Sequence, residues 1–91
     1  MPHSVHDNAA RHRFELDLDG FTAFSEYQRA DGVLTITHTE VPKQLNGRGI
    51  GSTLVRGLLD IARAQGMKVR PLCPFVKAYI DRHPDYADLL A

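Results

Sequence analysis

Glycines stand at every second position in the middle of the chain, at Gly47, Gly49 and Gly51 of the segment QLNGRGIGS, residues 44–52. Glycine lets the backbone turn at positive φ and lets a ligand approach the chain closely. Successive backbone N–H groups in such a loop can form a concave anion site, and the N-terminus of a following helix adds a positive partial charge. The segment therefore predicts a site for a phosphate or pyrophosphate, to which Arg48 would add a fixed positive charge.

Glycine-rich loops of this kind occur in several classes of protein, and two well-known phosphate loops do not fit this one. The phosphate loop (Walker A motif) of nucleoside triphosphatases needs Gly-Lys-Ser/Thr at its end, and no such triplet occurs in the chain. The dinucleotide-binding pattern G-x-G-x-x-G also fails, because the glycines here follow G-x-G-x-G and no second β-α-β half comes after them. A flexible turn at the start of a helix would also be rich in glycine and is the structural alternative.

A histidine and a glutamate precede the loop on an expected strand, 33–41 (VLTITHTEV). With a period of two, His38 and Glu40 share one face with Leu34 and Ile36 and lie near the C-terminal end of the strand. Either side chain could accept a proton from a reacting amine, directly or through one water molecule. Alternatively, His38 is a hydrogen-bonded core residue, and Glu40 is a surface residue or caps the loop.

The single cysteine, Cys73, lies between an expected strand and the proline that opens a helix. A helix N-terminus can lower the pKa of a thiol and favour the thiolate. A lone cysteine can equally be a small buried hydrophobic residue. If its strand runs parallel to strand 33–41, then Cys73, His38 and Glu40 reach the same edge of the sheet, where α/β sheets bind ligands.

The elements that would position these residues follow from hydrophobic periodicity and turn signals. Strands are expected at 13–18, 21–29 and 33–41, joined by the turns 19–20 and 30–32, which gives an antiparallel meander. A helix is expected at 50–65, with Gly66 at its C-terminal cap, then a strand at 67–72. Helices at 75–81 and from Pro84 to Leu90 complete the order β-β-β-α-β-α-α. The fold class is α/β with a mixed, twisted sheet of about four strands.

Composition narrows the class of protein. The 91 residues include 11 basic and 11 acidic side chains, so a basic nucleic-acid-binding surface is not expected. We expect a flexible segment at 1–12 and a single domain at 13–91. One cysteine, no signal-peptide core and no membrane-length apolar run favour a cytoplasmic protein. The histidines are not grouped at metal-ligand spacing, so no metal is expected.

The motif Gln44-x-x-Gly47-x-Gly49 matches the pattern Q/R-x-x-G-x-G/A of the GNAT (Gcn5-related N-acetyltransferase) superfamily. Together with HTEVP (38–42), NGRGIGS (46–52) and PLCPFV (71–76), it resembles the short stand-alone GNAT-like proteins of about a hundred residues. The resemblance runs from about residue 14 to 90. It implies an acyl-CoA N-acyltransferase-like fold with a reduced GNAT core, without the helices between the first strands and the later strands that larger members have.

By resemblance, the chain is an N-acetyltransferase that uses acetyl-CoA and an amine acceptor. The strand before the loop would border the pantetheine, and the loop would hold the pyrophosphate of coenzyme A. The residues so implied are Val41, Gln44, Leu45, Asn46, Gly47, Arg48, Gly49, Ile50, Gly51 and Ser52. A non-catalytic module that binds coenzyme A or acyl-CoA is the alternative, since the acceptor-side elements are missing. The protein would be a monomer or a homodimer, without membrane or nucleic-acid partners.

Two routes of acetyl transfer are open. In the direct route, Glu40 or His38 deprotonates the amine, which then attacks the thioester. The resemblance implies this route, because it is the usual one in the superfamily, and it is the route we expect. In the covalent route, Cys73 takes the acetyl group first and passes it on. The short GNAT-like proteins carry a cysteine at this place, beside the bound coenzyme, which implies that Cys73 lines the active site.

Overall fold

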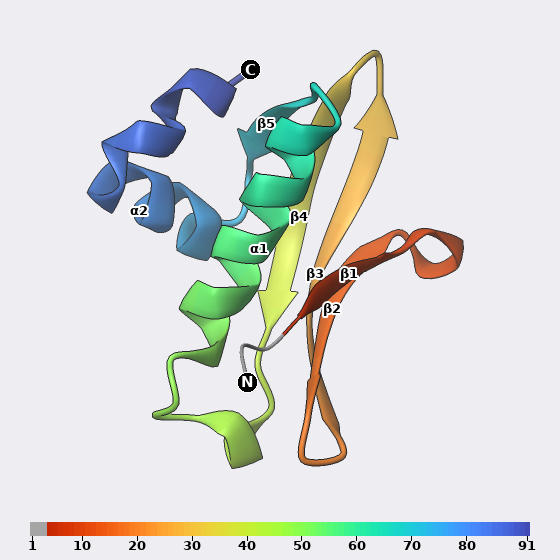
Figure 1. Ribbon diagram of the computed structural model, residues 1–91, viewed down its shortest axis with the longest axis vertical. Coiled ribbons are helices and arrows are strands. Elements are labelled where there is room, and N and C mark those ends of the chain that lie inside the picture. Colours follow the sequence, from red (N-terminus) through yellow and green to blue (C-terminus); the bar gives the residue numbers. More distant parts are fainter. Residues whose placement is uncertain (1–3) are drawn as a thin grey trace.

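The computed structural model describes residues 4–91 and shows one five-stranded sheet with helices packed on it (Figure 1). The strands follow the chain across the sheet in the order β1-β2-β3-β4-β5. Their bounds are β1 Val5–Asn8, β2 Arg13–Leu18, β3 Phe21–Ala30, β4 Val33–Glu40 and β5 Lys68–Pro71. The helices are α1 Ile50–Ala64 and α2 Pro74–Arg82, with 3-10 helices η1 Ala9–Arg11, η2 Lys43–Leu45 and η3 Pro84–Leu89.

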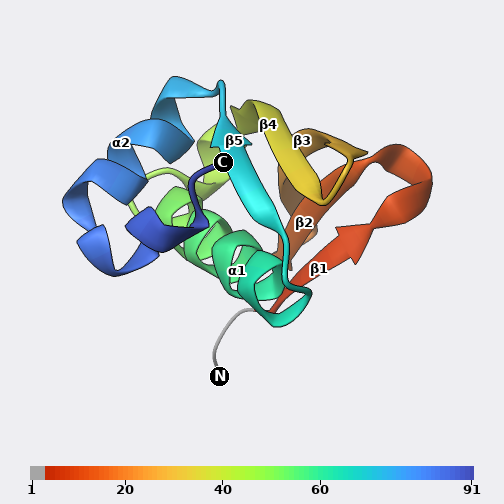
Figure 2. The same cartoon turned by 90° about the horizontal axis from the view of Figure 1, so that it is seen from above.

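The helices α1, α2 and η3 all lie on one side of the sheet, and none of them covers the other side (Figure 2). The apolar face of α1 therefore packs against the covered face of the strands. The hydrophobic core between them includes Phe14, Leu16, Leu34, Ile36, Leu54, Leu58 and Val69, each fully buried. On the uncovered face the side chains are largely polar, so this face needs no second layer to be stable in water.

The expected order of elements is confirmed from residue 13 onwards. Strands β2, β3 and β4 form the antiparallel meander, and β5 returns beside β4 in parallel after α1. Gly66, just beyond α1, has φ +69°, the left-handed conformation that ends a helix at glycine. The short helix η2 was not expected. In residues 4–91 neither α-helix is long and apolar enough to cross a membrane.

The expectation of a flexible segment over residues 1–12 is wrong for residues 5–11, while residues 1–3 lie outside the described part of the chain. Strand β1 pairs antiparallel with β2 from Val5↔Leu16 to Asn8↔Arg13, which adds a fifth strand. The side chain of Val5 packs directly onto Gly57 of α1, where the missing side chain leaves room.

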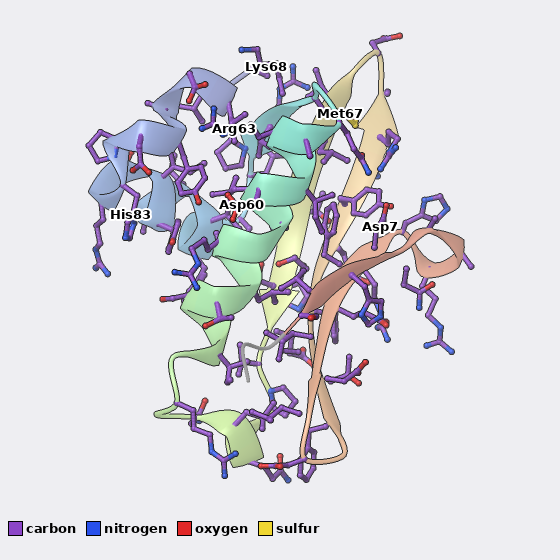
Figure 3. The ribbon with its side chains drawn as sticks, in the orientation of Figure 1. Asp7, Asp60, Arg63, Met67, Lys68 and His83 are labelled. Atoms are coloured by element: carbon purple, nitrogen blue, oxygen red, sulfur yellow. The ribbon has the colours of Figure 1, made fainter. Side chains whose placement is uncertain are left out.

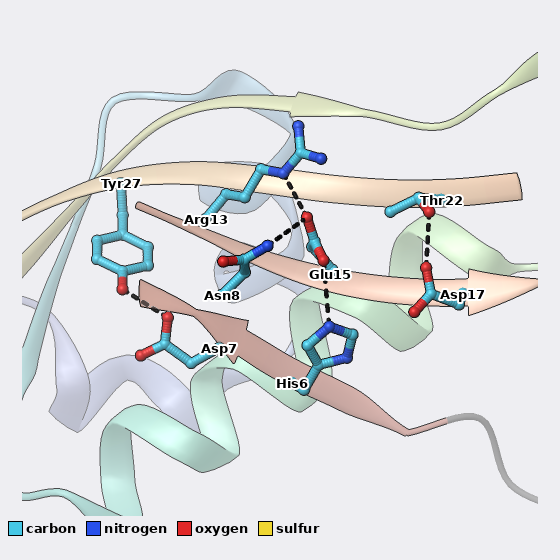
Figure 4. A network of polar contacts seen from close by, with 8 residues as sticks. All are labelled: His6, Asp7, Asn8, Arg13, Glu15, Asp17, Thr22 and Tyr27. Carbon is cyan, nitrogen blue, oxygen red and sulfur yellow. Dashed lines mark hydrogen bonds and ion pairs between the residues drawn. The ribbon is translucent and has the colours of Figure 1, made fainter. Parts of the chain in front are cut away.

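A polar network also fixes β1 to β2 (Figure 4). The carboxylate of Glu15, only 7% exposed, accepts hydrogen bonds from Arg13 Nε at 2.5 Å and Asn8 Nδ2 at 3.2 Å, and lies 3.1 Å from His6 Nε2. Burial alone would raise the pKa of Glu15, but these three partners outweigh it and hold the pKa below its usual value. A buried carboxylate needs such partners, so residues 5–8 have specific contacts that the sequence pattern did not reveal.

Strand β4 contains a bulge, and this overturns the expectation that His38 and Glu40 share a face with Leu34 and Ile36. Ile36 pairs with Tyr27, but His38 pairs with Glu26, so one extra residue, Thr37, enters β4 at this point. Because side chains alternate along a strand, one extra residue moves every later side chain to the other face. His38 and Glu40 therefore lie on the uncovered face.

Helix η3 closes the far end of α1. Arg63 of α1 makes two hydrogen bonds to the carboxylate of Asp88, at 2.8 and 3.0 Å, and Tyr86 donates one to Asp60 at 2.7 Å. Figure 3 shows Asp60 and Arg63 on α1, with Lys68 near the same end. Ala91 N–H donates to the carbonyl of Val69, so the C-terminal residues line the outer edge of β5. Arg63 thus has a structural partner and is not free for a ligand.

Candidate functional site

An open groove of about 440 Å³ lies at the N-terminal end of α1. We call it the glycine-loop groove. It is lined by Thr39, Val41, Leu45, Asn46, Gly47, Gly49, Ile50, Gly51, Ser52 and Phe75. A volume in this range is typical of small-molecule sites. The groove lies where the sequence motif predicted an anion site.

The backbone at this helix end is free to bind an anion. The N-cap of α1 is Gly49, and no side chain caps the helix. Within residues 4–91, the well-formed main-chain hydrogen bonds stop at Asn46 N–H to the Lys43 carbonyl and resume at Thr53 N–H to the Gly49 carbonyl, so residues 47–52 donate none of good geometry. The first N–H groups of a helix point along its axis with the positive end of the helix dipole. The arrangement therefore fits a phosphate group.

The three glycines serve two different purposes. Gly47 and Gly49 have φ +79° and +68°, and a β-carbon on either would meet nothing within 4 Å. They are needed for the backbone conformation, and the space above them stays open. Gly51 lies inside α1, and its β-carbon would come 2.7 Å from Cζ of Phe75. Gly51 is therefore needed so that the aromatic ring can form one wall of the groove.

Two of the expected cofactor residues do not line the groove: Gln44 and Arg48. Arg48 forms an ion pair of 2.5 Å with Asp19 in the turn between β2 and β3, with both side chains about half exposed. The guanidinium thus ties the loop to the neighbouring hairpin. Positive charge from this side chain does not point into the groove, and the backbone has to provide the attraction.

Thr39 and Phe75 line the groove although sequence reasoning did not select them as site residues. Phe75 was within reach of sequence reasoning, because it belongs to the motif PLCPFV. In the structure its side chain is 45% exposed, which is unusual for a large apolar residue. Thr39 was not within reach, because its direction depends on the bulge at Thr37. Without the bulge, Thr39 would face away from the helices.

Strands β4 and β5 separate at the groove. They pair from Val33↔Lys68 to Ile36↔Pro71, and the carbonyl of Ile36 accepts the last bonds, from the N–H groups of Leu72 and Cys73. Beyond this point residues 38–40 of β4 pair only with β3. The edge of β4 that faces β5 therefore has no partner strand there, next to the glycine-loop groove that Thr39 and Val41 line.

Cys73 lies at the N-terminus of α2, next to this separation, and is 6% exposed. Its Sγ lies 3.5 Å from Thr39 Oγ1, and Thr39 Oγ1 lies 2.7 Å from Ser25 Oγ. Burial raises the pKa of the Cys73 thiol, but hydrogen bonding by Thr39 and by the backbone of Val76 and Phe75 outweighs it and leaves the pKa below the usual value. The thiol is thus poised to ionise more readily than an ordinary cysteine.

His38 and Glu40 do not face Cys73. His38 Nε2 lies 3.4 Å from Glu40 Oε1, their side chains are 54% and 60% exposed, and the ring of His38 packs edge-on to Phe24 at 6.2 Å. All three candidates lie at the C-terminal ends of the parallel strands β4 and β5, as expected. The bulge, however, divides them between the two faces of the sheet. A reaction that uses Cys73 together with His38 or Glu40 must therefore take place across the separation of β4 and β5.

A second hollow of about 250 Å³ adjoins the glycine-loop groove at Ser52 and is lined also by Thr53, Arg56, Tyr79 and His83. The rings of Tyr79 and His83 stack at 4.0 Å, and His83 Nδ1 lies 2.8 Å from the carbonyl oxygen of Tyr79. Among residues 4–91 no three histidine, cysteine or acidic side chains come together as a metal site would require.

Comparison with known proteins bears on the family and the fold of the chain. The family model described as GCN5-related N-acetyl-transferase matches residues 13–89. Protein NATD1 of Gallus gallus is 28% identical over 87 residues, which cover 91% of this chain and 78% of the relative. Protein NATD1 of Homo sapiens is 31% identical over 52 residues, which cover 57% of this chain and 46% of the relative.

A GCN5-like protein from Staphylococcus aureus, solved in solution, superposes with a TM-score of 0.72. It is 24% identical in sequence, and the match covers 97% of this chain and 87% of that one. The mixed sheet and its helices thus have the fold of the acyl-CoA N-acyltransferases. At this level of identity the likeness concerns the fold alone.

Proposed function

Because the chain belongs to the GCN5-related N-acetyltransferase family, we propose that it transfers the acetyl group of acetyl-CoA to a primary amine. The observation that carries the proposal is the uncapped N-terminus of α1, whose first residues, 49–52, line a groove together with Gly47 and donate no well-formed main-chain hydrogen bond. Acyl-CoA presents a diphosphate, and a row of unpaired N–H groups at a helix end is suited to that group.

The remaining parts of coenzyme A fit the surroundings of this groove. The pantetheine chain, with its amide groups, suits the unpaired edge of β4 beyond Ile36, between Val41 and Phe75. The 3′-phosphate suits the adjoining hollow, where Arg56 is exposed and forms no ion pair within residues 4–91. On this assignment the charged partner of the 3′-phosphate is Arg56, and neither Arg48 nor Arg63 contacts coenzyme A.

The division of the candidates between the two faces favours the direct route. An amine that reaches the separation of β4 and β5 from the uncovered face meets His38 and Glu40. One of them takes a proton from the amine, the nitrogen bonds to the acetyl carbon, the carbon–sulfur bond breaks, and the proton ends on the departing thiolate. Cys73 is on the covered face with a lowered pKa, which in this route would be the side of the thioester sulfur.

Binding and turnover test this proposal separately. Coenzyme A at ~100 times its dissociation constant should stabilise the protein by about 2.7 kcal/mol, which is a clear rise in Tm for a domain of this size. Acetyl-CoA with a panel of primary amines should release free thiol and give acetylated amine by mass spectrometry. A Tm rise without thiol release for any amine would identify a binding module instead. No Tm rise at millimolar coenzyme A would refute the proposal altogether.

The variant Cys73→Ala separates the two routes. In the direct route it keeps most of its activity, and no acetyl adduct forms on the wild-type protein after incubation with acetyl-CoA. In the covalent route the adduct appears on Cys73 and the variant is inactive. Glu40→Gln and His38→Gln should each lower kcat and change its pH profile, because a proton acceptor has been removed.

A further inference from the structure

Another groove, of about 500 Å³, shares no residue with the glycine-loop groove or with the hollow beside it, and the function proposed above does not use it. We call it the η1 groove. It is lined by Arg11, His12, Glu26, Tyr27, Gln28, Arg29 and Thr37. It therefore extends from the turn between β1 and β2, across β3, to the bulge residue of β4.

The η1 groove exists because β3 is longer than its neighbour. The last pair between β2 and β3 is Arg13↔Glu26, so residues 27–30 of β3 have a strand partner on the β4 side only. The chain before β2 turns away at His12, which has a left-handed φ of 53°, and its carbonyl accepts a hydrogen bond of 2.9 Å from Tyr27 N–H. This bond holds the turn of η1 beside the open part of β3 as one wall of the groove.

The groove carries one unpaired charge of each sign. The exposed side chains of Arg11 and Glu26 form no ion pair within residues 4–91, whereas Arg29 is occupied by Asp7 at 3.2 Å. Arg13, opposite Glu26 on β2, is directed to Glu15 and lies over the ring of Phe24 at 4.3 Å. The carboxylate of Glu26 and the guanidinium of Arg11 are thus both available to a ligand.

Glu26 also connects the η1 groove to His38 and Glu40, the candidate proton acceptors on β4. It lies directly opposite His38 on β4, and the bulge residue Thr37 donates a hydrogen bond of 3.4 Å to its carbonyl oxygen. A cationic group held by Glu26 therefore lies beside His38 on the uncovered face, the side from which an acceptor would approach the thioester.

We propose that the η1 groove binds the acceptor, and that this acceptor is a small zwitterionic primary amine, an aminocarboxylate. Glu26 binds the amine before it is deprotonated, and Arg11 binds the carboxylate at the other end. The inference rests on the acetyltransferase function proposed above for the chemistry of transfer, but the binding of the ligand does not depend on it. Charge complementarity carries the choice, since a diamine would leave Arg11 facing a like charge.

Binding is tested with 4-aminobutyrate, butylamine, butyrate and 1,4-diaminobutane on the ¹⁵N-labelled full chain. 4-Aminobutyrate should shift the amides of Tyr27, Gln28 and Thr37 and bind about tenfold tighter than butylamine, as expected for one added charge-assisted contact. Equal affinity for butylamine, stronger binding of the diamine, or shifts confined to other parts of the chain would overturn the inference.

Two variants test which side chain binds each end of the ligand. Arg11→Met should weaken 4-aminobutyrate about tenfold and leave butylamine unchanged, while Glu26→Gln should weaken both. Arg70→Met removes an exposed arginine on β5 that does not line the groove and serves as the matched control. If Arg11→Met and Glu26→Gln bind 4-aminobutyrate as tightly as the control does, the assignment is wrong.

The Tm rise with coenzyme A, measured on the same variants, separates this inference from the function on which it rests. A rise with coenzyme A but no binding of 4-aminobutyrate refutes the η1 groove and leaves the acetyltransferase proposal standing. Binding of 4-aminobutyrate with the expected variant pattern, but no rise with coenzyme A, supports the groove and refutes the acetyltransferase proposal.

Discussion

The side chain of Val5 fills the space beside Gly57 of helix α1. Any other residue at position 57 would place its β-carbon in that space. A β-carbon built on Gly57 would lie 2.6 Å from Cβ of Val5, well inside contact distance. The N-terminal strand thus packs on α1 through the absence of a side chain. This contact packs β1 against the hydrophobic core of the domain.

Replacing Gly57 by alanine should therefore destabilise the protein, although alanine is the better helix former. The gain in helix propensity is about 1 kcal/mol, whereas overpacking costs about 1–3 kcal/mol and would displace β1. Urea unfolding should show a lower midpoint. In the background Val5→Ala the same replacement should be neutral or stabilising, because the clash is gone. An increase in stability of Gly57→Ala in the wild-type background would show that Val5 does not restrict this position.

Gly49→Ala tests whether backbone conformation makes the anion site. The left-handed φ of +68° costs alanine about 1–2 kcal/mol, so the loop should relax and the affinity for coenzyme A should fall about tenfold. Gly20→Ala is the matched control, because Gly20 has φ +79° with equally open space but lies in the hairpin turn between β2 and β3. The two variants should lose similar stability, and only Gly49→Ala should lose affinity by calorimetric titration.

The assignment of charged partners predicts a contrast between two arginines. Arg56→Met should weaken coenzyme A about three- to fivefold, as for one exposed charge contact, and leave 3′-dephospho-CoA unaffected. Arg48→Met should change neither affinity, since its guanidinium is paired with Asp19. An Arg48→Met protein that loses affinity for both ligands would show that this ion pair opens when coenzyme A binds.

The thiol of Cys73 should respond to the hydroxyl of Thr39. Thr39→Val removes a hydrogen bond that lowers the pKa of Cys73, so the midpoint of its alkylation by iodoacetamide should move to higher pH. Thr39→Ser keeps the hydroxyl and should leave the midpoint in place. If both variants react with the pH profile of the wild type, Thr39 does not control the ionisation of Cys73.

The order of elements from residue 13 onwards could be read from the sequence, because it depends on local signals. Alternating apolar residues, turn dipeptides such as Asp19-Gly20 and helical spacing after Ile50 act over a few residues each. The glycine loop was recognisable for the same reason, since a left-handed backbone at Gly47 and Gly49 is a requirement on single residues. The family resemblance drew on these same segments, and the matching family model agrees with it.

Only the tertiary structure decided which side chains meet. Whether β1 forms depends on Gly57, some fifty residues away, and whether Arg48 reaches the groove depends on Asp19 in another turn. The most consequential case is Thr37: its bulge appears only in the pairing of β4 with β3, yet it sends His38 and Glu40 to one face and Thr39 to the other. Period-two reasoning assumes an unbroken ladder, so a single extra residue, placed by contacts between strands, reverses its result.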